Sequence, residues 1–297
     1  MTSSSSSSNP AQLPRRAYGK TGIELSIIGF GGIVVMMAEQ DRANRVVAEA
    51  VERGVNYFDV APGYFDAEVK LGPALEPYRK NVFLACKTGQ RTYEGVKTEL
   101  KRSLERLRTD YLDLYQHHAL IDLKKDVDVV FEKDGAMEAF VEAKREGKVR
   151  YLGFSAHTVE AAFAAMDRYD FDSVLFPFNF GAYLGGKFGP QVIARAQEKG
   201  VARLALKALA RQQWTKDHPL RETYKKCWYE PLTDPREAEL ALRFTLSQPI
   251  TAALPPGEES LFRMALDFGM RFRPITPEEE KELREKAAGL DVIFRAA

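Results

Sequence analysis

Residues 82–118 read VFLACKTGQRTYEGVKTELKRSLERLRTDYLDLYQHH. The apolar run Val82–Lys87 has the length and continuity of a strand that is buried on both faces, and Leu112–His117 is a second run of this kind. Between the two runs, apolar residues recur at the helical period: Val96, Leu100, Leu104 and Leu107. The stretch therefore predicts a strand, a helix and a second strand, which is the repeating unit of a parallel sheet covered by helices.

Six further apolar runs of strand length continue this alternation along the chain. They are Ile27–Phe30, Tyr57–Ala61, Val149–Phe154, Ser173–Phe178, Ala202–Leu209 and Ile250–Leu254. Eight strands that alternate with helices close on themselves, so the sequence predicts an α/β fold of the (β/α)8 TIM barrel type. An open doubly wound sheet is the competing fold, but Gly29, Gly31 and Gly32 stand too close together for its phosphate-binding turn.

The remaining stretches define the domain organisation. Gly19 and Gly22 can supply positive φ at a tight turn, so residues 16–26 predict a short N-terminal β-hairpin. Residues 1–14 are rich in serine and predict a disordered polar tail, whereas residues 15–297 predict one barrel domain. Two longer irregular stretches, Ala119–Asp134 and Ala210–Thr233, have the length typical of lids or specificity loops.

The composition favours a small-molecule partner. The 43 Lys and Arg residues nearly balance the 42 Asp and Glu residues, so neither nucleic acid nor an anionic membrane is an expected partner. Cys86 and Cys227 have neither the spacing of a disulfide framework nor that of a metal site. No signal peptide or membrane-spanning run is recognised, and we expect a cytoplasmic monomer or small homo-oligomer without a bound metal.

Polar residues end three consecutive predicted strands. Asp59 closes the second strand and is followed by Tyr64, Lys87 closes the third, and His118 follows the fourth. Each of these alone is more often a cap, a packing residue or a solvated side chain. In a TIM barrel, however, the strand ends meet at one rim, where active sites lie, so the four side chains together indicate catalysis.

The four groups suggest acid catalysis. A neighbouring ammonium favours the phenolate, so Lys87 is expected to lower the pKa of Tyr64, while Asp59 keeps Lys87 charged. His118 could donate a hydrogen bond to a substrate carbonyl. Because protein side chains do not supply hydride, a reduction at this site requires a nicotinamide cofactor.

The sequence resembles the aldo-keto reductase family. The resemblance rests on residues 56–64, on the Lys87 strand, on residues 110–118 and on residues 147–155, and it extends from Arg16 to Asp267. It implies that Asp59, Tyr64, Lys87 and His118 form the catalytic tetrad, with His118 rather than His117 at the family's histidine position. It further implies an NADP(H) cofactor that lies extended across the barrel rim without a Rossmann fold.

The resemblance also implies cofactor contacts, with several departures. Ser155 matches the family's carboxamide-binding serine, but Ala156 and Leu175 replace an expected Asn and Gln, and His157 could replace one of the lost hydrogen bonds. Leu206 takes the place of a ring that stacks on the nicotinamide, and Lys207 could reach the pyrophosphate. The full set of candidate contacts is Gly31, Ser155, His157, Leu206, Lys207, Leu209, Pro256, Gly257, Glu258 and Arg263.

The loop at residues 255–260 bears on the choice between NAD and NADP. Glu258 and Glu259 would repel an adenosine 2′-phosphate but could accept hydrogen bonds from a free ribose hydroxyl, which favours NAD slightly. Arg263, one helical turn further on, could restore binding of the phosphate.

The substrate is expected to be an aldehyde, a ketone or a sugar, as carbonyl or alcohol. Candidate pocket residues are Val34, Met36, Tyr93, Phe180, Tyr183, Trp214, Trp228 and Tyr229. Two other functions fit a barrel of this kind: a cofactor-binding regulatory protein with little turnover, and a lyase that uses Lys87 as a Schiff base. The second is disfavoured because a carboxylate beside Lys87 opposes loss of its proton.

Overall fold

The structure is a computed structural model and describes residues 12–296. Its main sheet contains eight strands: β3 (Phe30–Gly31), β4 (Tyr57–Asp59), β5 (Phe83–Thr88), β6 (Leu112–Leu120), β7 (Val149–Ala156), β8 (Ser173–Pro177), β9 (Ala202–Leu206) and β12 (Ala252–Leu254). Neighbouring strands are parallel, in the order β12, β9, β8, β7, β6, β5, β4, β3.

The two edges of this sheet meet and close it. Ile28 forms a parallel bridge with Ala253, and the Gly29 amide donates to the Ala253 carbonyl at 3.0 Å. The predicted (β/α)8 barrel is therefore confirmed, although β4 and β9 end earlier than predicted. The chain leaves β9 at Leu206 because Lys207 has a positive φ of 62°.

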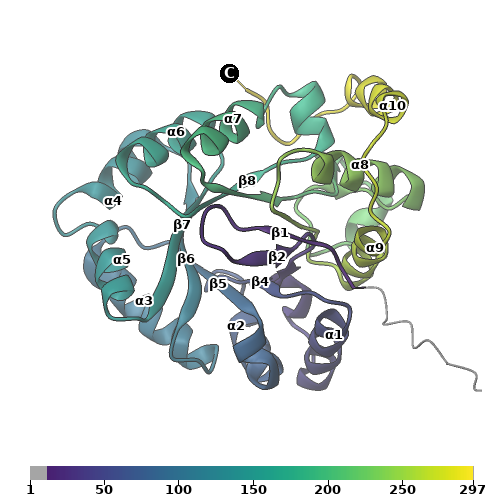
Figure 1. The fold of residues 1–297 in the computed structure, drawn as a ribbon. Helices are drawn as coiled ribbons and strands as arrows, with labels where there is room; N and C mark the ends of the chain where they lie inside the picture. Colours follow the sequence, from purple (N-terminus) through teal and green to yellow (C-terminus); the bar gives the residue numbers. More distant parts are fainter. Residues whose placement is uncertain (1–11, 297) are drawn as a thin grey trace, which may run out of the picture.

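Helices surround the barrel as an outer ring (Figure 1). They are α1 (Gln40–Glu52), α2 (Ala67–Leu75), α3 (Tyr93–Arg106), α4 (Val129–Phe131), α5 (Ala136–Arg145), α6 (Val159–Arg168), α7 (Pro190–Lys199), α8 (Pro235–Ser247), α9 (Glu259–Met270) and α10 (Pro277–Ala287). In α3, the buried Val96 and Leu100 face the barrel, as the periodicity predicts. None of the helices between residues 12 and 296 is both long and apolar enough to cross a bilayer.

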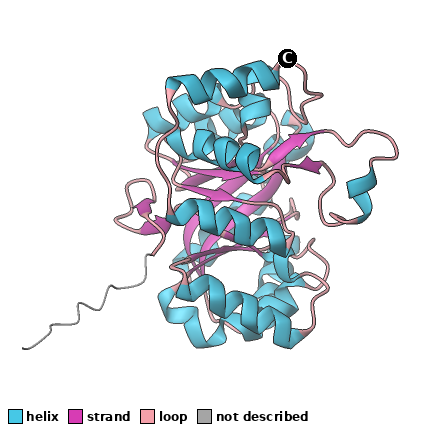
Figure 2. Cartoon of the chain, turned by 90° about the vertical axis from the view of Figure 1, so that its right-hand side faces the viewer, coloured by secondary structure: helices cyan, strands magenta, loops and turns pink. Residues whose placement is uncertain are grey.

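The predicted N-terminal hairpin is present and covers one end of the barrel. It consists of β1 (Arg15–Ala17) and β2 (Glu24–Ser26), paired antiparallel, and Figure 2 shows it to one side of the barrel strands. Tyr18 and Leu25 are fully buried against barrel residues such as Phe83 and Leu114. The hairpin thus seals the end of the barrel opposite the strands' carboxyl ends, so a ligand must enter from the other end.

The stretches predicted to be a tail and irregular loops contain more structure than expected. Leu13 is buried, so the fold begins before Arg15, whereas residues 1–11 of the expected tail lie outside the described residues. The 119–134 stretch contains a helical turn over Leu123–Asp128 followed by α4. In the 210–233 stretch, β10 (Ala210–Gln212) pairs with β11 (Glu230–Pro231).

Candidate active site

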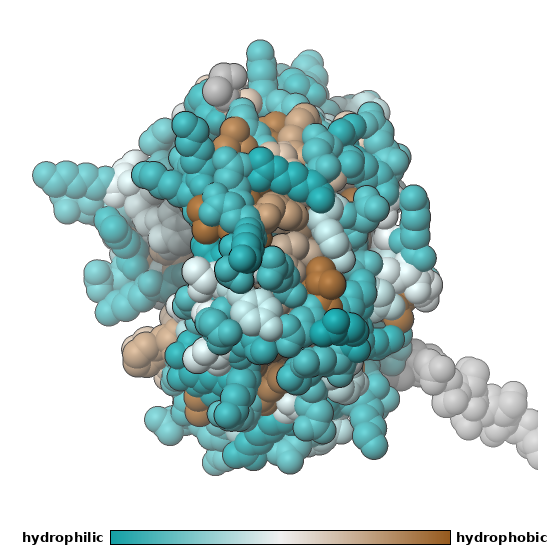
Figure 3. All heavy atoms as spheres, turned by 90° about the vertical axis from the view of Figure 1, so that its left-hand side faces the viewer, coloured by the Kyte–Doolittle hydropathy of each residue, from teal (hydrophilic) through white to brown (hydrophobic). Residues whose placement is uncertain are grey.

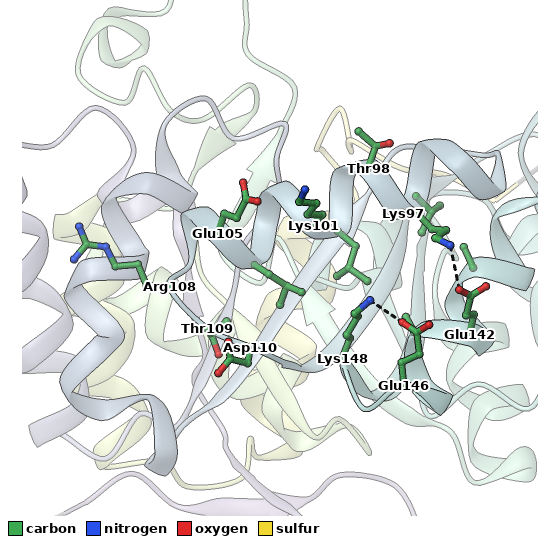
Figure 4. Close-up of a pocket in the computed structure, with 15 residues that line it drawn as sticks. Lys97, Thr98, Lys101, Glu105, Arg108, Thr109, Asp110, Glu142, Glu146 and Lys148 are labelled. Atoms are coloured by element: carbon green, nitrogen blue, oxygen red, sulfur yellow. Dashed lines mark hydrogen bonds and ion pairs between the residues drawn. The ribbon is translucent and has the colours of Figure 1, made fainter.

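Two hollows of the molecule differ in the chemistry of their linings. A hollow of about 700 Å³ lies on the outer surface between α3 and α5. Four of its charged lining residues pair with one another, Lys97 with Glu142 at 3.1 Å and Lys148 with Glu146 at 2.6 Å (Figure 4). This side of the molecule is mainly hydrophilic with scattered apolar patches (Figure 3). The hollow adjoins the amino ends of β6 and β7 and contains none of the four candidate catalytic residues.

The second hollow, of about 250 Å³, lies where the barrel strands end. The four candidate catalytic side chains all line it: Asp59, Tyr64, Lys87 and His118. They come from three adjacent strands, β4 to β6, and from the loop after β4. Among the described residues no group of three or more His, Cys, Asp or Glu side chains is arranged to hold a metal ion. The cavity thus brings together the four side chains that the sequence indicates.

A buried ion pair stands at the base of the cavity. The Lys87 ammonium contacts a carboxylate oxygen of Asp59, and both side chains are almost completely excluded from solvent. The same ammonium donates to the Tyr64 hydroxyl at 3.4 Å. The Tyr64 ring meets the His118 ring edge-on, with 5.8 Å between the ring centres. The four groups thus form one continuous set of contacts.

Burial and charge set the protonation of these groups. Burial alone lowers the pKa of Lys87, but attraction to Asp59 and Tyr64 outweighs it and raises that pKa above its usual value. Burial raises the pKa of Tyr64, and the nearby Lys87 offsets this only in part. The expectation that Lys87 lowers the pKa of Tyr64 overall is therefore wrong, because removal of the phenol from water is the larger effect. Tyr64 is a neutral phenol at physiological pH.

His118 is neutral as well. Burial, with repulsion from Lys87, Arg91 and Lys207, lowers its pKa to about 3. Its neighbour His117 points away from the cavity and stacks on Phe140 with 3.9 Å between ring centres. Of the two histidines, His118 is the one that the structure places in the cavity.

Two residues that the sequence reasoning missed support Asp59. The Gln116 amide donates to the second carboxylate oxygen of Asp59 at 2.9 Å, and the Tyr57 hydroxyl donates to the same oxygen at 3.3 Å. Both are fully buried. Side chains alternate along a strand, so Gln116 shares the inward face with His118, as Tyr57 does with Asp59. Following this alternation inward from the rim could have identified both residues.

The cavity also holds most of the candidate cofactor residues. Seven of the ten line it: Gly31, Ser155, His157, Leu206, Lys207, Pro256 and Gly257. The hydroxyl of Ser155 accepts from the Ala119 amide at 2.7 Å, which ties the end of β7 to β6. The lining residues Ile33 and Lys226 were not anticipated, because they come from the loop after β3 and from the 210–233 stretch.

Lys207 is an ammonium without a carboxylate partner among the described residues. It lies over the rings of Trp228 and Phe294, at 5.6 and 5.5 Å from their centres, and 3.5 Å from the Nε2 atom of His157. Burial, with repulsion from Lys87, lowers its pKa to about 7. Phe294 belongs to the C-terminal segment and has no sequence signal that ties it to the barrel rim.

Three candidate cofactor residues do not line the cavity. Leu209 is fully buried in the core. The Glu258 carboxylate accepts from the Lys226 amide at 2.8 Å. Arg263 pairs with Glu49 and Glu259 on the surface of α9.

The candidate substrate residues divide in the same way. Trp228 and Tyr229 line the cavity. Tyr93 instead contacts Glu142 between α3 and α5, and Trp214 donates to the Cys227 carbonyl at 2.9 Å. The others pack against the core, namely Val34, Met36, Phe180 and Tyr183. These six do not line the cavity, so their part in binding a substrate stays a prediction.

The chain is similar in sequence and in fold to known proteins. The chain is 26% identical to the Bacillus subtilis protein named uncharacterized oxidoreductase YqkF, over 91% of this chain and 95% of that protein. L-galactose dehydrogenase of Arabidopsis thaliana is 32% identical over 52% of this chain and 51% of its own length. The holo form of an aldo-keto reductase from Bacillus halodurans shares the fold, with a TM-score of 0.73 and 24% identity over 94% of this chain and 98% of that one.

A family model decides the assignment. The model described as "Aldo/keto reductase family" matches residues 28–227, a range that includes Asp59, Tyr64, Lys87 and His118. The chain also has an eight-stranded barrel with those four side chains in one cavity at its rim. It therefore belongs to the aldo/keto reductase family, whose members are generally oxidoreductases.

Proposed function

We propose that this protein transfers hydride between a nicotinamide cofactor and the carbonyl carbon of an aldehyde, a ketone or a sugar, with Tyr64 as the general acid. The observation that carries the proposal is the contact set at the strand ends, in which a buried Lys87–Asp59 pair touches the phenol of Tyr64 beside His118. A phenol that is neutral at physiological pH has a proton to give, and a cation next to it stabilises the phenolate that remains.

The roles of the other residues follow from their charges. His118 is neutral, so it can donate one N–H hydrogen bond to a carbonyl oxygen and orient it without competing as the acid. Lys87 stays charged through Asp59 and acts on Tyr64 rather than on the substrate. Trp228 and Tyr229 provide aromatic surface against which the rest of the substrate can pack.

The lining of the cavity has groups that suit the nicotinamide and phosphate parts of a dinucleotide. The two phosphates of a nicotinamide dinucleotide are anionic, and Lys207 and Lys226 line the cavity without a carboxylate partner among the described residues. Ser155 and His157 offer polar groups near the carboxamide end. When bound, the cofactor supplies the hydride that no side chain can provide.

For the adenosine end we propose a slight preference for NAD. Glu259 holds Arg42 at 2.7 Å and also pairs with Arg263. Both guanidiniums are already engaged by carboxylates, so a 2′-phosphate would have to displace Glu259 to reach them. A free ribose hydroxyl meets no such competition. A side-by-side titration of both cofactors by fluorescence quenching tests this, and a preference for NADP above tenfold would refute it.

The proposed activity is tested by NADH and NADPH oxidation at 340 nm with a panel of aldehydes, ketones and sugars. Sugars belong in the panel because one relative is named L-galactose dehydrogenase. Tyr64→Phe should lower kcat by about 10²–10⁴, the usual worth of a positioned acid, while cofactor affinity is retained. If the unaltered protein oxidises neither cofactor with any of these compounds, the proposal fails.

The alternative lyase function fits less well. A Schiff base at Lys87 requires the neutral amine, but Asp59 and Tyr64 raise the pKa of that amine. Borohydride trapping of a carbonyl compound on Lys87 would favour the lyase. The regulatory alternative predicts cofactor binding without turnover in the oxidation assay.

A further inference from the structure

On β6, Gln116 is the inward-facing residue that precedes His118. It is paired in register with Lys87 across β5 and β6, and it lies two residues before His118 on the same inward face. Its side chain is fully buried. A buried amide beside an ion pair stabilises the pair if it forms a hydrogen bond to it, and destabilises the pair if it does not.

The orientation of this amide is fixed by the chemistry of its neighbour. An ionised carboxylate only accepts hydrogen bonds, so the Gln116 Nε2 group must face Asp59 Oδ2, which it does at 2.9 Å. The opposite end of the amide, Oε1, is buried and has no hydrogen-bond partner among the described residues. Reversing the amide would place its oxygen against the Asp59 carboxylate, where two acceptors would face each other.

The unpartnered Oε1 atom has a further consequence. A buried acceptor without a donor destabilises a fold, and an apolar side chain of similar shape avoids that cost. Gln116 is therefore a poor choice for stability alone. Its benefit lies at the other end of the amide, where it holds one oxygen of Asp59 and leaves the second oxygen to Lys87.

We infer that Gln116, assisted by Tyr57, is a positioning residue that fixes the Asp59 carboxylate so that Lys87 is held against the Tyr64 hydroxyl. This inference rests on the proposed function. Three donors meet one carboxylate: Lys87 on one oxygen, with Gln116 and Tyr57 on the other. Without the two lower donors the carboxylate can rotate, and the ammonium moves with it.

The test compares Gln116→Met with a matched control on the same strand, His117→Leu. Both variants replace a buried side chain that has unpartnered polar atoms, but His117 faces away from the cavity. A hydrogen bond to a charged group corresponds to a rate factor of about 10–100. We therefore expect Gln116→Met to lose about that factor in kcat, with KM for the cofactor unchanged and a Tm within about 3 °C of the unaltered protein. His117→Leu should retain kcat.

A second measurement on Gln116→Met provides a readout that does not need turnover. If loss of the amide lets the Asp59–Lys87 pair move away from the Tyr64 hydroxyl, the ammonium stabilises the phenolate less, so phenolate formation by Tyr64 should move to higher pH. It is followed by ultraviolet absorbance, with the matching variant that also carries Tyr64→Phe subtracted. His117→Leu should leave the titration of Tyr64 unchanged.

These outcomes distinguish failure of the inference about Gln116 from failure of the proposed function. If the unaltered protein is active and Gln116→Met keeps its kcat within twofold, or loses activity only in step with a lower Tm, the inference is overturned. If the unaltered protein turns over no carbonyl, the proposed function fails. In that case an unchanged Tyr64 titration in Gln116→Met overturns the inference too, whereas a titration that moves to higher pH in Gln116→Met but not in His117→Leu upholds the positioning of the Asp59–Lys87–Tyr64 set.

Discussion

Lys87 contributes to how the free energy of unfolding depends on pH. Replacing Asp59 by asparagine should reverse the sign of this contribution. In the unaltered protein the folded-state pKa of Lys87 lies above its unfolded value of about 10.4. Its contribution to stability is then fully present below that value and is lost as pH rises through the folded pKa. The asparagine amide carries no charge and cannot stabilise the ammonium as the carboxylate does. In the variant, burial is therefore the dominant effect, and it lowers the folded-state pKa of Lys87 below the unfolded value.

The magnitude follows from the burial of the pair. Both side chains are at most 2% exposed, so Asp59→Asn strands an ammonium in the interior, at a cost of about 3–5 kcal/mol at neutral pH. Where Lys87 is neutral in the folded variant but charged when unfolded, stability rises by about 1.4 kcal/mol per pH unit. Between pH 7 and pH 10 the variant should therefore recover most of its deficit.

The assay is urea unfolding followed by circular dichroism at intervals from pH 7 to pH 10. Lys207 has a lowered pKa and also makes stability rise over this range, but it does so in every variant. The quantity of interest is therefore the difference between Asp59→Asn and the double variant Asp59→Asn/Lys87→Met. A difference that stays flat with pH would show that Lys87 is not a buried cation held by Asp59, and the reasoning about Tyr64 would fall with it.

Three further predictions concern residues around this centre. His117→Leu should raise the free energy of unfolding by about 1 kcal/mol, measured by urea denaturation, because it removes two buried nitrogens without partners among the described residues. The affinity for either cofactor should fall as pH rises through about 7, where Lys207 loses its charge, and Lys207→Met should abolish this dependence in a fluorescence titration at pH 6 to 9. Glu259→Gln should move cofactor preference toward NADP by about tenfold, or about 1.4 kcal/mol, since Arg42 loses its carboxylate partner and Arg263 keeps only Glu49. Unchanged dissociation constants would exclude the surroundings of Glu259 as the ribose site.

The spacing of apolar residues along the sequence is sufficient to predict the barrel and the grouping of four polar residues at its rim. Strand period and helical period are both visible in residues 82–118, and strand ends converge in any parallel barrel. Asp59, Lys87 and His118 could therefore be placed at one rim from their positions alone. The same rule applied one layer deeper would have identified Gln116 and Tyr57.

Tertiary contacts explain where the structure differs from the sequence predictions. The sequence does not show which partners an aromatic side chain has in the fold. Tyr93 and Trp214 are predicted to line the pocket, but in the structure they contact Glu142 and the Cys227 carbonyl. Phe294 reaches Lys207 from a distant part of the sequence, a contact with no local signal. The direction of the Tyr64 pKa shift was wrong because it depends on how completely the phenol is withdrawn from water, which becomes visible only when the chain is folded.

The order of the pKa values around the cavity determines which group can act as the acid, and it predicts the pH profile. His118 holds no extra proton above about pH 3, and the raised pKa of Lys87 keeps its proton on the ammonium. Tyr64, with a pKa raised above 10, is left as the only member of the four that both has a proton and gains by releasing it next to a cation. The kcat for carbonyl reduction at saturating cofactor should therefore be flat from pH 5 to 9 and change only as Tyr64 ionises. Lys207 titrates within that range, but it should affect cofactor affinity and not kcat. A kcat profile with a limb near neutral pH that survives cofactor saturation would assign proton transfer to another group.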